Sequence, residues 1–365
     1  MLDTAILKNE EQAVFALRSL YRRYGYLPYK MRKFEDYEYY IRNKDFLVSD
    51  RIITFNDTNG TLLALKPDVT LSIIKNGEDV PGCKQKVCYN ENVYRVSENT
   101  HRFKEILQAG LECIGDIDLY DIFETVSLAA QSLALISEDF ALQVSHLGIL
   151  SDVLDRVCGD LGFQEKAIGF LKSKNAHDLT RLCREYGVED TLPVRLLSAY
   201  GQRSKVINIL EDMGCGGEAL EELKALSILL DSLPWSDRIL FDFSLVNNRK
   251  YYNGIVFRGF VEGVPEGVLS GGEYDGLMER MHRKEKAIGF ALYPDLLERL
   301  EEPTQQPEPE AVLLYDPDAS ASAVTAAAQK LRAEGTNVCV LPDTGKQPNA
   351  AKCYVLKGNE VKPLG

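Results

Sequence analysis

A long helical block, residues 150–232, is the feature that most constrains the fold of this chain. Apolar residues recur at helical spacing through nearly all of it, and its short helices end near glycines or polar clusters, as in helical bundles. Pro234 closes the block, and strand patterns lie on both sides of it in the chain. We therefore expect an α+β fold in which a strand-rich core carries a helical insertion at 150–232.

The flanking regions alternate between strands and a few helices. Amphipathic patterns predict helices at 9–24, 120–136 and 274–282. Asn59-Gly60 stands between two apolar runs and predicts a β-hairpin. The segments that we expect to be extended are 26–35, 50–70, 84–96, 104–115, 238–246, 251–263 and 268–277.

The end of the chain differs from the rest. Residues 301–310, EEPTQQPEPE, are acidic and rich in proline, a composition typical of a linker. Residues 311–365 then give a strand, a helix and further strands, which predicts a small α/β unit. A unit of that size has little core of its own. We expect a core at 1–300, a linker at 301–310 and a C-terminal unit at 311–365.

Composition excludes several classes of function. The 365 residues carry a formal net charge of −13, which argues against nucleic acid as a partner, since phosphate contacts need basic residues. The 8 cysteines are scattered without zinc-site spacing, so we expect reduced thiols and neither a metal nor a cofactor. We found no signal-peptide pattern and no long apolar run. These observations favour a cytoplasmic protein that does not enter membranes.

A candidate binding pair occurs in LKPDVTLSI, residues 65–73. If this segment is a strand, Asp68 and Thr70 lie on the same face, where a carboxylate and a hydroxyl could together hold an ammonium group. Pro67-Asp68 is also ordinary turn chemistry, so a turn is the equal alternative.

Together with 65–73, three later segments resemble histidyl-tRNA synthetases of class II in the same order. They are 93–115, with Gln108 and Glu112 on one strand face, 244–260, with a Tyr-Tyr pair, and 269–277, Leu-Ser-Gly-Gly-Glu-Tyr-Asp-Gly-Leu. The resemblance implies a mixed, mostly antiparallel sheet flanked by helices. It also implies a histidine pocket, whose matching positions here are Asp68, Thr70, Gln108, Glu112, Tyr252 and Tyr274. Carboxylates suit the ammonium or ring N–H groups of histidine, and amide and hydroxyl groups add neutral hydrogen bonds.

The differences from the synthetases lie on the nucleotide side. Asn247 and Leu296 stand where arginines are expected, and Ser97 replaces an acid two places after Arg95. Arg95 is kept and Arg102 lies in the following loop, so these two are possible anion contacts. Losing cations that stabilise the developing charge of adenylate formation typically costs about 10² to 10³ in rate for each group. We therefore expect no synthetase activity.

Further departures are local. Tyr293 and Pro294 replace small residues before Leu296, and Arg32 replaces the usual proline of the first class II signature, through which such cores dimerise. The resemblance still implies a homodimeric core. Arg249 lies near the position of Asn247 but out of register with it.

The family with this pattern comprises the regulatory subunits of ATP phosphoribosyltransferase, which look like a histidyl-tRNA synthetase core without its activity. This resemblance implies a non-catalytic subunit that binds a short catalytic subunit in a hetero-oligomer of histidine biosynthesis and transmits feedback by histidine. Residues 311–365 resemble a truncated anticodon-binding domain. It remains open whether histidine occupies this pocket or a subunit interface. Two alternatives remain: a divergent histidyl-tRNA synthetase that uses Arg95 with Arg249, and a structural or RNA-binding relative with an empty pocket.

Overall fold

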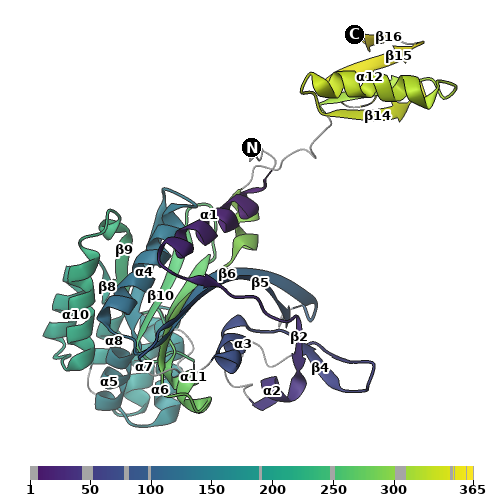
Figure 1. Cartoon of the computed structure of the whole chain (residues 1–365). Helices are drawn as coiled ribbons and strands as arrows, with labels where there is room; N and C mark the ends of the chain where they lie inside the picture. The colour runs from purple at the N-terminus through teal and green to yellow at the C-terminus, as the bar shows by residue number, and fades with distance from the viewer. Residues whose placement is uncertain are drawn as a thin grey trace. The chain divides into compact units, whose positions relative to one another are not determined.

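The computed structural model describes residues 7–42, 52–77, 82–97, 100–188, 191–246, 251–300, 310–345, 348, 350–358 and 360–364. Asn247 and Arg249 lie outside the described residues. The chain divides into two compact units, Met1–Leu300 and Glu301–Gly365 (Figure 1). The first unit contains the long sheet and the helical block.

A nine-stranded sheet forms the centre of the described part of the first unit. Its strands, in spatial order, are β1 (Leu27–Pro28), β5 (Gln85–Val96), β6 (Phe103–Gly115), β12 (Lys286–Leu292), β11 (Leu269–Glu273), β10 (Ile255–Val261), β7 (Phe140–His146), β9 (Ile239–Asp242) and β8 (Tyr200–Gly201). The pairs β1–β5 and β7–β9 are parallel and the other described pairs are antiparallel. This confirms the expected mixed, mostly antiparallel sheet. The strand β7 was not expected, although Phe140, Leu142 and Val144 alternate in the core.

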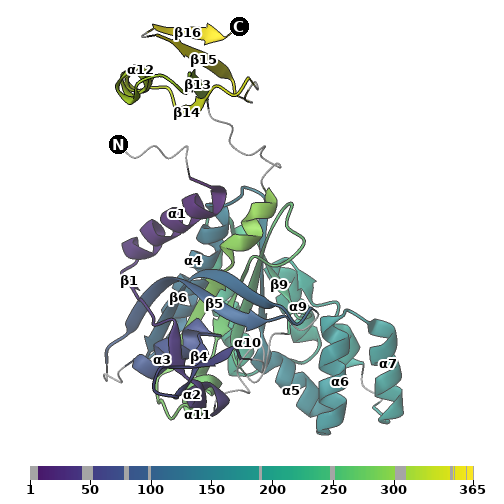
Figure 2. The ribbon, with the colours of Figure 1, turned by 90° about the vertical axis from the view of Figure 1, so that its right-hand side faces the viewer.

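Helices α1 (Asn9–Arg23) and α4 (Leu119–Ala134) pack against the sheet, and both were expected (Figure 2). Asp118 begins α4, because its carboxylate accepts the backbone N–H groups of Tyr120 and Asp121. Apolar residues of α4, such as Val126, Ala129 and Leu133, are fully buried in the main core. This face of the sheet is therefore closed by helices.

A smaller sheet lies beside the first, with the described order β2 (Phe34–Asp36), β4 (Leu62–Leu65) and β3 (Thr54–Asn56). The helices α2 (Tyr37–Arg42) and α3 (Val69–Asn76) accompany it. Strands β3 and β4 form the expected hairpin, and Gly60 has the positive φ of 83° that its turn requires.

The structure corrects the prediction that the extended segment 50–70 continues as a strand through Asp68 and Thr70. Strand β4 ends at Leu65, and Asp68 is the N-cap of α3, where its carboxylate accepts the backbone N–H of Leu71 at 2.9 Å. Strand alternation therefore does not explain how Asp68 and Thr70 are placed. The alternative of local turn chemistry was closer, since aspartate prefers helix starts as well as turns.

The helical block contains the helices α5 (Leu147–Val157), α6 (Leu161–Lys172), α7 (Ala176–Glu185), α8 (Leu192–Leu196), α9 (Arg203–Asp212) and α10 (Glu218–Leu230). Figure 2 shows α5, α6 and α7 grouped at one side of the core. Their apolar faces join the same hydrophobic core as the sheet. Asp160 caps α6, where its carboxylate accepts the backbone N–H of Phe163, so α5 and α6 are separate helices. No helix in the described ranges is long and apolar enough to cross a membrane.

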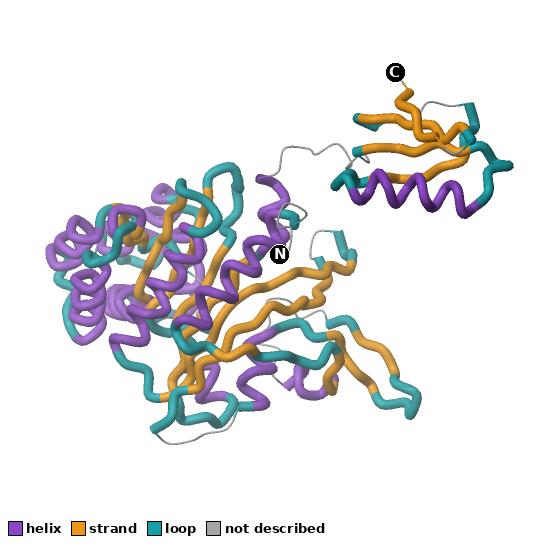
Figure 3. Tube along the Cα trace, turned by 45° about the horizontal axis from the view of Figure 1, so that its top comes forward, coloured by secondary structure: helices purple, strands orange, loops and turns teal. Residues whose placement is uncertain are grey.

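The remaining elements of the first unit are the 3₁₀ turns η3 (Ser236–Arg238) and η4 (Pro294–Leu300) and the short helix α11 (Asp275–Arg280). The second unit contains β13 (Ala311–Tyr315), α12 (Ala321–Ala333), β14 (Val338–Pro342), β15 (Lys352–Lys357) and β16 (Glu360–Leu364). Its described strands follow the order β14-β13-β15-β16, and Figure 3 shows α12 lying along this sheet. The expected strand–helix–strand pattern is confirmed.

Candidate functional site

A cavity of about 310 Å³ opens over the long sheet on the face that α4 does not cover. Its floor crosses neighbouring strands and is made of small residues, among them Ser270 on β11 and Gly289 and Ala291 on β12. Gly289 pairs with Glu112 on β6, and a Cβ at Gly289 would overlap both the Glu112 carboxylate and the Leu111 carbonyl. The glycine therefore makes room for a buried acid.

Glu112 is the most enclosed acid of the cavity and is 2% exposed. Its Oε1 accepts a hydrogen bond from Thr70 Oγ1 at 2.7 Å, and its Oε2 accepts one from the Tyr274 hydroxyl at 2.7 Å. Burial raises the pKa of Glu112 to about 8, although these hydroxyl donors oppose the shift. A cationic group entering the cavity would favour the ionised form of this carboxyl.

Asp68 and Arg95 form a second charged pair in the cavity wall. Arg95 Nη2 lies 3.8 Å from Asp68 Oδ2, and Arg95 Nε donates to the Pro67 carbonyl at 3.0 Å. Burial raises the pKa of Asp68, and the nearby Arg95 guanidinium partly opposes this. The local fold therefore fixes the Arg95 side chain against Asp68 and the chain before α3.

Aromatic hydroxyls surround the acids. The ring centroids of Tyr251 and Tyr252 lie 4.7 Å apart, and those of Tyr251 and Tyr274 lie 5.8 Å apart. Burial raises the pKa of each of these three tyrosines well above its ordinary value, so they act as neutral hydroxyls. They give the cavity apolar walls with polar tips.

All six residues that the resemblance placed around histidine line this cavity: Asp68, Thr70, Gln108, Glu112, Tyr252 and Tyr274. Gln108 is 4% exposed, and its amide makes no side-chain hydrogen bond to the described residues. Arg95 also lines the cavity. Arg102 does not, because it is exposed in the loop between β5 and β6.

Several lining residues were not predicted: Tyr89, Tyr251, Arg258, Gly267, Ser270, Gly289, Phe290, Ala291 and Tyr293. Tyr293 was noted only as a departure from the synthetases, yet its hydroxyl lies 3.2 Å from Ser270 Oγ. Tyr251 could have been predicted as a lining residue, because it is the neighbour of Tyr252 in the Tyr-Tyr pair. Two of the other described departures lie elsewhere: Leu296 packs against the main core, and Ser97 forms hydrogen bonds within the β5–β6 loop.

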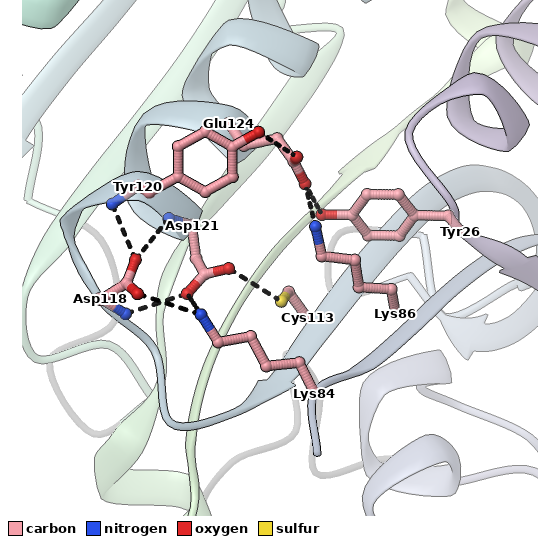
Figure 4. Close-up of polar contacts among 8 residues, drawn as sticks. All are labelled: Tyr26, Lys84, Lys86, Cys113, Asp118, Tyr120, Asp121 and Glu124. Carbon is pink, nitrogen blue, oxygen red and sulfur yellow. Dashed lines mark hydrogen bonds and ion pairs between the residues drawn. The ribbon is translucent and has the colours of Figure 1, made fainter. Parts of the chain in front are cut away.

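A second charged cluster lies on the opposite face of β5 and β6, between these strands and α4. Figure 4 shows its members, Tyr26, Lys84, Lys86, Cys113, Asp118, Tyr120, Asp121 and Glu124. Lys84 Nζ lies 2.5 Å from Asp121 Oδ2 and 3.1 Å from Asp118 Oδ2, while Lys86 Nζ lies 2.5 Å from Glu124 Oε1. These contacts attach α4 to the strands. Nowhere in the described ranges do three or more His, Cys, Asp or Glu residues gather as a metal site.

The match to a protein family covers most of the chain. Residues 2–297 match the family model described as histidyl-tRNA synthetase. The chain belongs to this family. Its expected class II fold is thereby confirmed.

Relatives within the histidyl-tRNA synthetase family narrow the assignment. The chain is 26% identical over 353 residues to the ATP phosphoribosyltransferase regulatory subunit of Oceanobacillus iheyensis, covering 93% of this chain and 86% of that one. It is 30% identical over 293 residues to the regulatory subunit of a Thermoanaerobacter species, covering 75% and 74%. A crystal structure described as an ATP phosphoribosyltransferase regulatory subunit/histidyl-tRNA synthetase from Bacillus halodurans has a TM-score of 0.75 at 26% identity, covering 95% and 92%. The chain is thus a family member of the regulatory-subunit type.

Proposed function

We propose that this chain is the non-catalytic regulatory subunit of an ATP phosphoribosyltransferase in histidine biosynthesis. It would bind a short catalytic subunit in the cytoplasm, support its activity and transmit feedback by histidine. The names of its relatives support the assignment to this complex. The observation that carries the histidine part is the cavity, where Glu112, Thr70 and Tyr274 form a buried polar centre.

The chemistry of the cavity fits a histidine ligand. A buried carboxylate needs a cationic or N–H partner to remain ionised, and histidine offers both an ammonium group and a ring N–H. The Gln108 amide is buried on the same face of β6 as Glu112, four residues away, and makes no hydrogen bond with the described residues. Buried tyrosine rings supply flat apolar walls for an imidazole.

Activation of histidine with ATP is not part of the proposed function. Adenylate formation needs preorganised cations around the carboxylate and phosphate. Leu296, at the position of an expected arginine, packs against the main core. The alternative of a divergent synthetase predicts histidine-dependent exchange of pyrophosphate into ATP, whereas we expect none above background.

Feedback requires that histidine bind one state of the complex more tightly than another. Coupling free energies of about 1–3 kcal/mol are typical of allosteric proteins and correspond to roughly 5- to 150-fold changes in affinity. We further propose a homodimeric core and a C-terminal unit that is a shortened anticodon-binding domain. The organisation of the chain into a core at 1–300 with an insertion at 150–232 and a linker at 301–310 belongs to the same proposal.

Reconstitution tests the proposed function. The purified chain is mixed with a short catalytic subunit, and phosphoribosyl transfer is measured with and without histidine. We expect the chain to raise the activity and histidine to lower it. An unchanged activity on adding the chain would reject the regulatory role, and activation that histidine does not affect would reject the feedback role alone.

A further inference from the structure

Arg258 is a cavity residue to which neither the resemblance nor the proposed function gives a role. It lies on β10 and pairs across the sheet with Ser270 on β11, which in turn pairs with Ala291 on β12. All three residues line the cavity. Arg258 and Ser270 therefore project from neighbouring strands on the cavity side of the sheet.

The Arg258 side chain is held in place by packing contacts. Its guanidinium carbon lies 5.3 Å from the ring centroid of Phe260, two residues along the same strand. A Cβ at Gly267 would overlap the Arg258 side chain at Nε, so the two pack closely. Aromatic and backbone contacts of this kind orient a guanidinium without neutralising it.

Arg95 and Arg258, the arginines among the described lining residues, differ in how their side chains are paired. Arg95 is engaged by Asp68 and by the Pro67 carbonyl. The Arg258 side chain makes no hydrogen bond or ion pair with any residue that the structure describes, and its guanidinium lies against the Phe260 ring. The hydroxyl pair Ser270–Tyr293 also lines the cavity, with its oxygens 3.2 Å apart. An uncommitted guanidinium and two hydroxyls together form a site for an anion.

The cavity therefore has an acidic group and an uncompensated basic group at different positions in its lining. Glu112 stands on β6 and Arg258 on β10, three strand spacings of about 4.8 Å apart, and the strand register also sets the two residues two positions apart along the strands. Both residues line the same cavity of about 310 Å³, so one small ligand can contact both of them. Resting on the proposed histidine ligand, we infer that Arg258 binds the α-carboxylate of that amino acid while Glu112 faces its cationic part.

A carboxylate fits Arg258 better than a nucleotide phosphate does. One guanidinium forms a two-pronged contact with one carboxylate, whereas a triphosphate needs several cations. The other arginine among the described lining residues, Arg95, is held by Asp68. Arg258 would therefore select for amino acids over amines of the same side chain.

Paired ligands test this role. L-histidine and histamine share the imidazole and the amine, but histamine lacks the carboxylate. Calorimetry with the full-length protein should show that Arg258→Gln lowers the affinity for histidine by about 10- to 100-fold. This is the range expected for the loss of one charged hydrogen bond. Histamine affinity should change by less than about twofold, which also shows that the variant is folded. Arg258→Lys should give an intermediate loss, because it keeps the charge but not the fork.

Arg299→Gln is the matched control, because Arg299 is an exposed arginine paired with Glu266 at 3.4 Å outside the cavity lining. This variant should leave the affinities for histidine and histamine unchanged. Equal losses of histidine and histamine in Arg258→Gln, or a loss of AMP binding with histidine unchanged, would overturn the carboxylate role. If the wild-type protein binds neither ligand, the proposed histidine pocket itself fails, and this inference fails with it.

Discussion

The two faces of strands β5 and β6 carry charged clusters that differ in how far their charges are paired. Glu112 faces the cavity, and the next residue, Cys113, faces α4, where its thiol lies 4.0 Å from Asp121. On the α4 side, Lys84 and Lys86 each lie within 2.5 Å of a carboxylate oxygen (Figure 4). On the cavity side, Glu112 is held by neutral hydroxyls and Arg258 has no charged partner among the described residues.

This difference distinguishes the structural cluster beside α4 from the proposed binding site. On the α4 side, the lysines and carboxylates pair with one another and attach α4 to the sheet, so none of these charged groups is available to a ligand. The Lys84 ammonium beside Asp118 holds the pKa of that carboxyl below its usual range, whereas burial raises the pKa of Glu112. A buried acid without a cation is costly to ionise, and a cationic ligand relieves that cost.

The largest effect is expected on the α4 side. Lys86→Met would leave Glu124, which is 5% exposed, without its cation. Removing one partner of a buried ion pair typically lowers the free energy of unfolding by about 3–5 kcal/mol. Urea unfolding should show this loss, while histidine affinity of the folded protein stays unchanged. Arg42→Met removes an equivalent pair with Glu38 that is exposed, and should change stability by less than about 0.5 kcal/mol. Similar effects of the two substitutions would contradict the structural role of the cluster.

The next effect concerns the floor of the cavity. Gly289→Ala should push the Glu112 carboxylate out of place, destabilising the protein by about 1–3 kcal/mol and weakening histidine binding. Gly276→Ala is the control, since nothing lies within 4 Å of a Cβ there and α11 accepts alanine. It should be neutral or stabilise by about 0.4–1 kcal/mol. Thermal unfolding with and without histidine measures both variants, and full binding by Gly289→Ala would show that the position of Glu112 does not matter.

A third expected effect is a pH dependence of stability. Burial raises the pKa of Glu112 to about 8, so the folded protein keeps a proton that the unfolded chain loses near its ordinary pKa of 4.5. Stability without ligand should therefore fall as pH rises from about 5 to 8, by up to about 1.4 kcal/mol per pH unit for this group. Glu112→Gln should flatten that slope in unfolding experiments. Part of it should remain, because burial also raises the pKa of Glu273 to about 8. An unchanged slope in the variant would show that Glu112 is ionised in the empty cavity.

The sequence predicted one side of the cavity better than the other. Gln108 and Glu112 are four residues apart on a strand, so their shared face follows from strand geometry. Asp68 and Thr70 were placed in the cavity by resemblance, but the strand argument for them was wrong, because Asp68 caps α3. Arg258, Ser270 and Ala291 meet only through the register of three strands, which one sequence does not reveal.

The fold shows the same division. Helices with a clear apolar stripe and the Asn59-Gly60 hairpin were predictable from local patterns, because their signals lie within a few residues. Strand β7 was missed, since a seven-residue strand between helices gives a weak pattern and is defined by its pairing with β10 and β9. Tyr89 likewise reaches Glu112 only through the β5–β6 pairing, with its hydroxyl 3.5 Å from Oε1.

The central claim is that histidine acts on a partner enzyme through this cavity, and one measurement tests it most directly. Phosphoribosyl transfer by a short catalytic subunit is titrated with histidine in complexes made with wild-type chain, Glu112→Gln or the exposed control Glu266→Gln. We predict equal activity without histidine in all three, and inhibition at the same concentrations for the wild type and the control. Glu112→Gln should require at least about tenfold more histidine, as expected for loss of a charged hydrogen bond. Identical inhibition curves for all three would contradict the claim and place the histidine site outside this cavity.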